Sequence, residues 1–205
     1  MELKDVFEQR QSVNFFDSAK DVDEAIIREI YDLAKLAPSS FNLQPWKIVL
    51  VHNPEQKAKL QKCAMDQPKV SESAFTAIML GDKKAYENMD PIMDGFIKLG
   101  YFKEEMRVAL KGMAKNLYGG DSERTFACRN VGLFAMAFML AAESLGIDTH
   151  PMDGFDAKAI RAEFNIPDNY EIVMLIAIGH FDQSKTLLPR CPRRSFDEVV
   201  IRESF

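Results

Sequence analysis

The stretch TFACRNVGLFAMAFMLAAESL at residues 125–145 decides how this chain folds. Every residue from Val131 to Ala142 is apolar, so a helix over this run has no polar face. Such a pattern is typical of a helix that is surrounded by protein. Arg129 and Glu143 bracket the run, which is shorter than a membrane-spanning helix requires. We expect a buried central helix that also contributes to a subunit interface.

The boundaries of this helix are marked by turn-forming residues. Asp121 or Ser122 is expected to cap its N-terminus, and Gly146 is expected to end it. Residues 147–156 then read IDTHPMDGFD. We interpret them as a turn that presents backbone groups to something held beside the helix.

Composition limits the functional classes. The 205 residues suffice for one domain with a sizeable core, and a net charge of −5 gives no reason to expect nucleic acid or an anionic membrane as a partner. The three cysteines are odd in number and widely spaced, which favours a reducing compartment over a disulfide framework. The first ten residues lack the apolar core of a signal peptide. We expect a cytoplasmic protein.

Apolar periodicity elsewhere predicts an α+β domain over residues 1–205, with a small mixed sheet flanked by helices around the long central helix. Asp21 and Glu24 resemble a capping box. Residues 83–120 are predicted to be a helical excursion that either packs into the core or forms a lid over a ligand site. The tail, residues 182–205, is expected to extend onto a partner subunit. The expected helices are 3–10, 22–37, 54–63 and 157–164, and the expected strands are 46–51, 75–80, 172–178 and, as a further candidate, 199–201.

Several common catalytic and binding motifs are absent from the sequence. It contains no dinucleotide-binding G-x-G-x-x-G after a strand, no P-loop and no G-x-S-x-G elbow. His52, His150 and His180 stand far apart, without the spacing of metal ligands, so no metal site is predicted.

Three polar loops remain as candidate binding elements. RQSVN at 10–14 offers an arginine fork and a hydroxyl that suit a phosphate, although an arginine is favourable at any helix C-terminus. PSSFNLQPW at 38–46 reads alternatively as an ordinary helix-to-strand turn. PMDGFD at 151–156 reads alternatively as a turn whose aspartate caps the next helix. Their occurrence together with an arginine-rich tail favours the binding interpretation.

Taken together, these stretches resemble the FMN-dependent nitroreductase family over nearly the whole chain. The matching elements are Pro38-Ser39-Ser40-x-Asn42-x-Gln44-Pro45-Trp46, Arg10-x-Ser12, Leu145-Gly146-Ile147, Pro151-Met152-x-Gly154-Phe155-Asp156, and Arg193 before Phe196-Asp197-Glu198-Val199-Val200. The resemblance is weakest over residues 83–118.

The resemblance implies an intertwined homodimer with FMN at the subunit interface and NAD(P)H, either NADH or NADPH, as a transient reductant. It implies hydride transfer through flavin N5 to a nitroaromatic, quinone or similar small oxidant by a ping-pong mechanism, with no single catalytic side chain. Met152, Asp153 and Gly154 would surround N5, and the 39–42 loop would come from the partner. The positions implied to bind the cofactor are Arg10, Gln11, Ser12, Asn14, Pro38, Ser39, Ser40, Asn42, Gln67, Pro151, Met152, Asp153, Gly154, Arg190 and Arg193.

Two departures from the family pattern are expected to weaken the binding of the FMN phosphate. The family commonly has arginines where this chain has Gln11 and Asn14, and each charge-assisted contact is typically worth about 1.5–3 kcal/mol. Arg190 and Arg194 are candidates to compensate. These departures would suit an alternative, a flavin-binding or regulatory protein with little turnover. Two further alternatives stay open: another flavin reaction of the same fold, such as dehalogenation, and a structural helical domain whose loop matches are coincidental.

Overall fold

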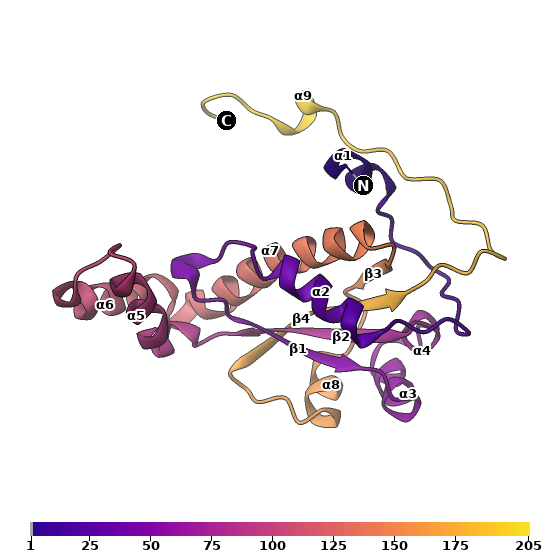
Figure 1. The fold of residues 1–205 in the computed structure, drawn as a ribbon, viewed down its shortest axis with the longest axis horizontal. Coiled ribbons are helices and arrows are strands. Elements are labelled where there is room, and N and C mark those ends of the chain that lie inside the picture. The colour runs from indigo at the N-terminus through magenta and orange to yellow at the C-terminus, as the bar shows by residue number, and fades with distance from the viewer. Residues whose placement is uncertain (1) are drawn as a thin grey trace.

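The computed structural model describes residues 2–205 and shows one four-stranded sheet enclosed by helices (Figure 1). The strand order is β1-β2-β4-β3, and each neighbouring pair is antiparallel. The prediction of an α+β fold is confirmed, but the sheet is not mixed, because the only parallel pairing recorded for residues 2–205 is an isolated bridge between Ser12 and Thr149. The strands are β1 (Trp46–Val51), β2 (Phe75–Asp82), β3 (Asp148–Met152) and β4 (Tyr170–Gly179).

The turn predicted at 147–156 proves to contain a strand. Residues Asp148–Met152 form β3 at the edge of the sheet, where only β4 is a strand neighbour. An edge position tolerates Pro151, which has no N–H to donate. The turn itself is confined to the residues after Met152, and Asp156 caps the following helix as the alternative interpretation expected, accepting from the Lys158 and Ala159 amides.

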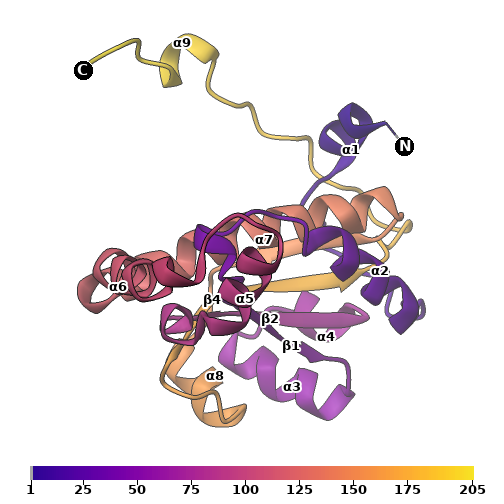
Figure 2. The ribbon, with the colours of Figure 1, turned by 60° about the vertical axis from the view of Figure 1, so that its left-hand side comes forward.

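Two layers of helices cover the sheet (Figures 1 and 2). One face packs against the central helix, and Phe134, Phe138 and Ile30 are buried there, with Trp46 stacked on Phe134 at 4.7 Å between ring centroids. The opposite face carries a second apolar cluster that includes Leu60, which is fully buried. The covering helices are α2 (Glu24–Ala34) and α7 (Glu123–Ser144) on the first face, and α3 (Pro54–Cys63), α4 (Lys69–Glu72) and α8 (Ala157–Glu163) on the second.

The caps of these helices differ in detail from the sequence prediction. The N-cap of α2 is Asp23, which accepts from the Ala25 amide at 2.8 Å, rather than Asp21. Ser122 occupies the N-cap position of α7 without a side-chain bond. Gly146, just beyond the C-cap, has a φ of +74°, a conformation that favours glycine.

The excursion between β2 and α7 is helical, as predicted. It projects beyond one end of the sheet (Figure 1) and has its own apolar cluster around Met89 and Met93. Tyr86 donates to the Glu123 carboxylate at 2.7 Å, which ties the excursion to α7 and raises the pKa of Tyr86 to about 12. Its elements are two α-helices, α5 (Asp90–Lys98) and α6 (Arg107–Tyr118), with the short 3-10 turns η2 (Ala85–Asn88), η3 (Glu104–Met106) and η4 (Gly120–Ser122).

The two ends of the chain stand away from the body. α1 (Leu3–Gln9) lies above the C-terminal end of α7, and the tail runs past it in an extended path (Figures 1 and 2). The strand considered at 199–201 is absent from the described residues. A single helical turn, α9 (Phe196–Val199), ends at the first of these residues and is capped by reciprocal bonds between Ser195 and Glu198.

α7 is more exposed than its composition predicts. Leu133 is 46% and Met136 is 37% exposed, so one stripe of this apolar helix is left partly uncovered by residues 2–205. The whole helix Gly120–Ser144 is longer than the apolar run at its centre, and by length and composition alone it could cross a membrane. In the described residues 56% of its most apolar stretch is buried inside the domain, as expected of a core helix.

Replacing Gly81 by alanine should destabilise the packing of α7 on β2. A Cβ at this position would lie 2.9 Å from the Cβ and 3.2 Å from the carbonyl oxygen of Ala127, so the helix must shift. Overpacking of this kind costs roughly 1–3 kcal/mol, measurable by urea unfolding at fixed protein concentration. Gly112→Ala is the matched control, since its Cβ meets nothing within 4 Å, and it should leave stability equal or raise it by up to about 1 kcal/mol. Equal stabilities for the two variants would contradict this packing.

Candidate functional site

Six of the predicted binding residues line one hollow of about 250 Å³ between the end of α1 and the tail. The tail supplies the other wall, with Leu187 and Leu188 among its apolar residues. Residues 180 positions apart are thereby brought together without any partner chain. The predicted residues in this hollow are Arg10, Gln11, Ser12, Asn14, Arg190 and Arg193.

The position of this loop is fixed by β3. Ser12 forms a parallel bridge with Thr149, and the Val13 amide donates to the Thr149 carbonyl at 3.3 Å. Val13 is buried, whereas its neighbours Ser12 and Asn14 are exposed. This alternation is that of an extended segment, and it turns both polar side chains outward.

Arg190 has a role that the sequence did not reveal. Its guanidinium donates to the carbonyl of Glu8 at 2.7 Å and to that of Arg10 at 2.9 Å. These carbonyls lie at the C-terminus of α1, where oxygens lack intrahelical partners and a cation is favoured. Arg190 therefore fastens the tail to the loop that carries Arg10.

The electrostatics of the hollow favour an anion. Burial first, and then the neighbouring Arg190 and Arg193, lower the pKa of Arg10, while Glu143 opposes them. Burial and Asp148 raise the pKa of Glu143, whereas Arg10 and Arg190 lower it. A hollow with surplus guanidinium groups, a hydroxyl and two amides fits a phosphate dianion.

A second group of predicted residues meets at the other end of β3. Gln67 donates its amide N–H to the Gly154 carbonyl at 2.8 Å and to the Ala64 carbonyl at 3.1 Å. Met152 is buried beneath this contact, and Asp153 is exposed. Gln67 is therefore held against the turn at 151–154. Gln67 and this turn were predicted from the sequence to share one binding site, and the two are in contact.

Two charged or polar residues beside this turn, Lys69 and His150, were not among the predicted site residues. Lys69 donates to Gln67 Oε1 at 3.4 Å, and burial lowers the pKa of Lys69. The Nδ1 of His150 donates to the Val13 carbonyl at 2.8 Å, which joins the turn to the loop at 10–14. A lysine two residues after Gln67 was visible in the sequence, but nothing there indicated which way it pointed.

The third predicted loop lies elsewhere. Residues 38–42 pack near the N-terminal half of α7, where the Ser40 amide donates to Asn130 at 2.8 Å. Arg10, by contrast, interacts with Glu143 at the opposite end of this helix. Figures 1 and 2 show α1 beside that end of α7. Asn130 and Glu143 are separated by 13 positions, or about 20 Å of helix. One chain thus presents its predicted site as two separate halves.

Comparison with known proteins identifies the family. The model of the nitroreductase family matches residues 7–180. The chain belongs to the nitroreductase family. It is 36% identical over 202 residues to a Bacillus subtilis protein named NAD(P)H nitroreductase MhqN, covering 97% of this chain and 98% of the relative. The crystal structure of the nitroreductase ydfN from B. subtilis matches with a TM-score of 0.91 and 35% identity over 98% of both chains.

A further solved structure bears on the cofactor. A nitroreductase from Exiguobacterium sibiricum, crystallised in complex with FMN, matches with a TM-score of 0.85 and 25% identity, covering 99% of this chain and 98% of that one. The nitroreductase family is FMN-dependent and uses NAD(P)H, so this chain is an oxidoreductase, and the prediction of its cofactors is confirmed.

His150 should make stability depend on pH. Burial and the nearby Lys69 lower its folded pKa below 6.5, although the bond to Val13 acts in the opposite direction. The unfolded chain therefore binds a proton more readily, and the stability that neutral His150 contributes above pH 6.5 is lost as the pH falls through the folded pKa. We expect the difference in melting temperature between wild type and His150→Gln to shrink between pH 7.5 and pH 5. A difference that stays constant or grows on acidification would contradict this assignment.

Proposed function

We propose that the chain acts as a homodimer in which each FMN lies between the loop at 10–14 of one subunit and the loop at 38–42 of the other. The chemistry that FMN supplies when bound is hydride transfer from NAD(P)H through its N5 atom to a nitroaromatic, quinone or similar small oxidant, in ping-pong fashion. The residues of this chain bind, orient and enclose the reacting groups. The observation that carries the proposal is the arginine-lined hollow joined through β3 to the Gln67–Gly154 contact.

In this proposal one subunit supplies the residues that bind the FMN phosphate and the residues along one side of the flavin ring. Arg10, Ser12 and Arg193 hold the phosphate, and Arg190 holds Arg10 in place through its carbonyl. Gln11 and Asn14 contribute hydrogen bonds without charge. Pro151, Met152, Asp153, Gly154 and Gln67 then lie beside the ring. Asp153 is exposed in the single chain.

The other wall comes from the partner. Pro38, Ser39, Ser40 and Asn42 are half-buried or exposed in one chain, and about 20 Å of α7 separates their anchor from the phosphate hollow. A twofold arrangement of two α7 helices brings the N-terminal half of one beside the C-terminal half of the other. The exposed stripe with Leu133 and Met136 would be covered by this contact.

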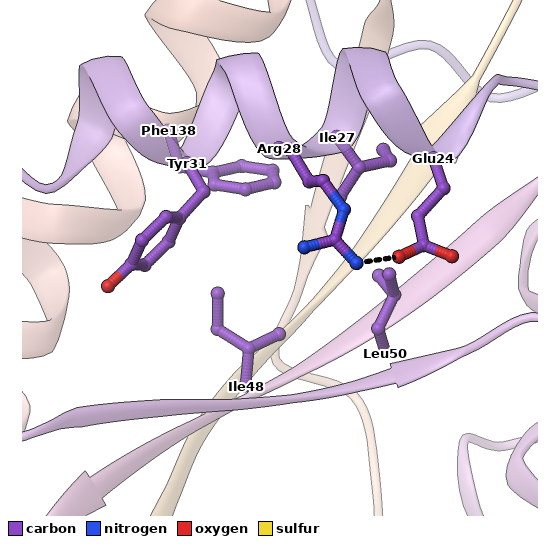
Figure 3. A pocket seen from close by; sticks show the side chains of 7 residues that line it. All are labelled: Glu24, Ile27, Arg28, Tyr31, Ile48, Leu50 and Phe138. Atoms are coloured by element: carbon purple, nitrogen blue, oxygen red, sulfur yellow. Dashed lines mark hydrogen bonds and ion pairs between the residues drawn. The ribbon is translucent and has the colours of Figure 1, made fainter.

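The tail offers a second dimer contact. Phe196 is 64% and Ile201 is 51% exposed, an exposure that favours a partner surface for these side chains. An apolar hollow of about 250 Å³ lies open between α2 and the edge strand β1 (Figure 3). Tyr31 and Ile48 line it, and the Arg28–Glu24 pair stands at its rim. We propose that the tail of the partner subunit packs in this region.

The helical excursion would act as a lid over the partner's flavin. Phe41 packs edge-on against Tyr118 at 6.1 Å, so the excursion must accompany the loop at 38–42 to the partner's site. Arg107 of α6 bonds to Asp94 of α5 at 2.7 Å and to Glu104 of η3 at 2.6 Å, which makes the excursion one unit. Exposed Met106, Met113 and Tyr101 would offer an adaptable apolar surface to a flat oxidant.

Arg10→Ala should release FMN. Loss of one charge-assisted bond weakens binding by roughly 10- to 150-fold, and fluorescence titration with FMN would measure it. Lys4→Ala is the control, because this side chain on α1 is 82% exposed and pairs only loosely with Glu8 at 3.7 Å. Equal FMN dissociation constants for wild type and Arg10→Ala would refute the phosphate assignment.

A further inference from the structure

Asn130 places an amide in the interior of an otherwise apolar stretch of α7. Its side chain is 1% exposed, and Phe126, Ala127 and Val131 beside it on the helix are buried as well. An amide without hydrogen-bond partners in such surroundings would be strongly unfavourable. Within residues 2–205, the other buried polar residues recorded are Ser73, Thr76 and Thr149.

The oxygen and the nitrogen of the Asn130 side-chain amide each form a hydrogen bond, and the two bonds together fix the orientation of the amide. Oδ1 accepts from the Ser40 amide at 2.8 Å, and Nδ2 donates to the Phe126 carbonyl at 2.7 Å. A backbone N–H can only donate and a carbonyl can only accept, so a flipped amide would lose both bonds. Asn130 therefore presents an acceptor in one defined direction, toward a loop 90 positions away in the chain.

The loop at residues 39–44, whose Ser40 amide donates this bond, has an unusual backbone. Phe41, Asn42 and Gln44 have φ values of 51°, 54° and 44°, in the left-handed region that residues other than glycine rarely adopt. The remaining hydrogen bonds of the segment are internal, such as that from the Gln44 amide to Ser39 Oγ at 3.0 Å. In the described part of the chain, the Ser40–Asn130 bond is the one recorded polar contact that joins residues 39–44 to another element.

Apolar packing holds the same loop without setting its direction. Leu43 is 5% exposed, and Phe41 contacts Tyr118, which stacks on Phe126 at 4.7 Å. These contacts would persist if the Asn130 amide were lost. The bond from the Ser40 amide to Asn130 adds a directional contact that ties the Ser40 backbone to α7, beside Ser39 and Asn42.

We propose that Asn130 is a positioning residue for flavin binding across the dimer interface. The inference rests on the proposed function, in which Ser39, Ser40 and Asn42 contact the FMN held by Arg10 of the partner. Asn130 touches no cofactor itself. It acts by holding the Ser40 backbone in the conformation that offers these side chains to the partner subunit.

Asn130→Leu tests this role, with Val131→Ala as the matched control. Val131 is the adjacent, fully buried residue of α7, and its truncation loses core packing without touching Ser40. Amide exchange of the Ser40 segment should accelerate roughly tenfold in Asn130→Leu and stay unchanged in Val131→Ala. The FMN dissociation constant should rise roughly fivefold or more in the first and remain within about twofold in the second.

Trp46 gives an independent readout of the loop. It is the only tryptophan of the chain, it follows the loop directly, and it stacks on Phe134. Its emission should shift in Asn130→Leu. If Asn130→Leu does not fold, Asn130→Gln replaces it, because a longer side chain moves the acceptor and should cause a smaller change in the same direction.

The outcomes separate this inference from the proposed function. Wild-type protein that takes up no FMN refutes the proposed function and, with it, the positioning role. Wild-type protein that binds FMN, with Asn130→Leu or Asn130→Gln binding as tightly as Val131→Ala, overturns the positioning role alone. Unchanged exchange at Ser40 overturns it equally, because the hydrogen bond would then not hold the loop.

Discussion

Burial of α7 between α2 and the sheet is the constraint on which the rest of the structure depends. The rings of Trp46, Phe134 and Phe138 pack with Ile30 into one core that fixes the helix along its length. A helix of 22 residues spans about 33 Å. Because α7 is straight and rigidly held, whatever is attached to its two ends stays apart. The loop at 38–42 is attached near one end, and the arginine hollow lies near the other.

Because the two loops lie far apart in one chain, the proposed flavin site can form only when two subunits associate. The residues of the hollow, the turn at 151–154 and Gln67 are gathered by β3 through contacts within one chain, whereas the serine–asparagine loop faces away from them. An apolar stripe along α7, an apolar tail and a helical excursion are all left partly uncovered. Two copies related by a twofold axis would cover these surfaces and unite the half-sites. In this account, the exposed apolar surfaces and the separated half-sites of one chain are complementary surfaces of a dimer.

Most elements could be predicted from sequence because their patterns are local. The strand at 46–51, the helix at 54–63 and the run at 172–178 are uninterrupted and bounded by turn residues, and the structure confirms them. β3 was missed because Asp148, His150 and Pro151 break the apolar alternation, and only its edge position permits a strand there. The residues of the phosphate hollow were found by motif. The contacts of Arg190 and Asn130 could not be found, because their partners lie 180 and 90 positions away and are backbone atoms with no sequence signature.

Mixed dimers of Arg10→Ala and Asn42→Ala chains test the shared site most directly. Each homodimer of a variant carries two damaged sites. If the two loops of one site come from different subunits, a mixed dimer has one site with both substitutions and one wholly native site. Titration with FMN should then find about one site of wild-type affinity per mixed dimer, with a sedimenting mass twice the 23.3 kDa of one chain. A mixed dimer with no site of wild-type affinity, or a protein that sediments as a monomer while retaining FMN, would contradict the account.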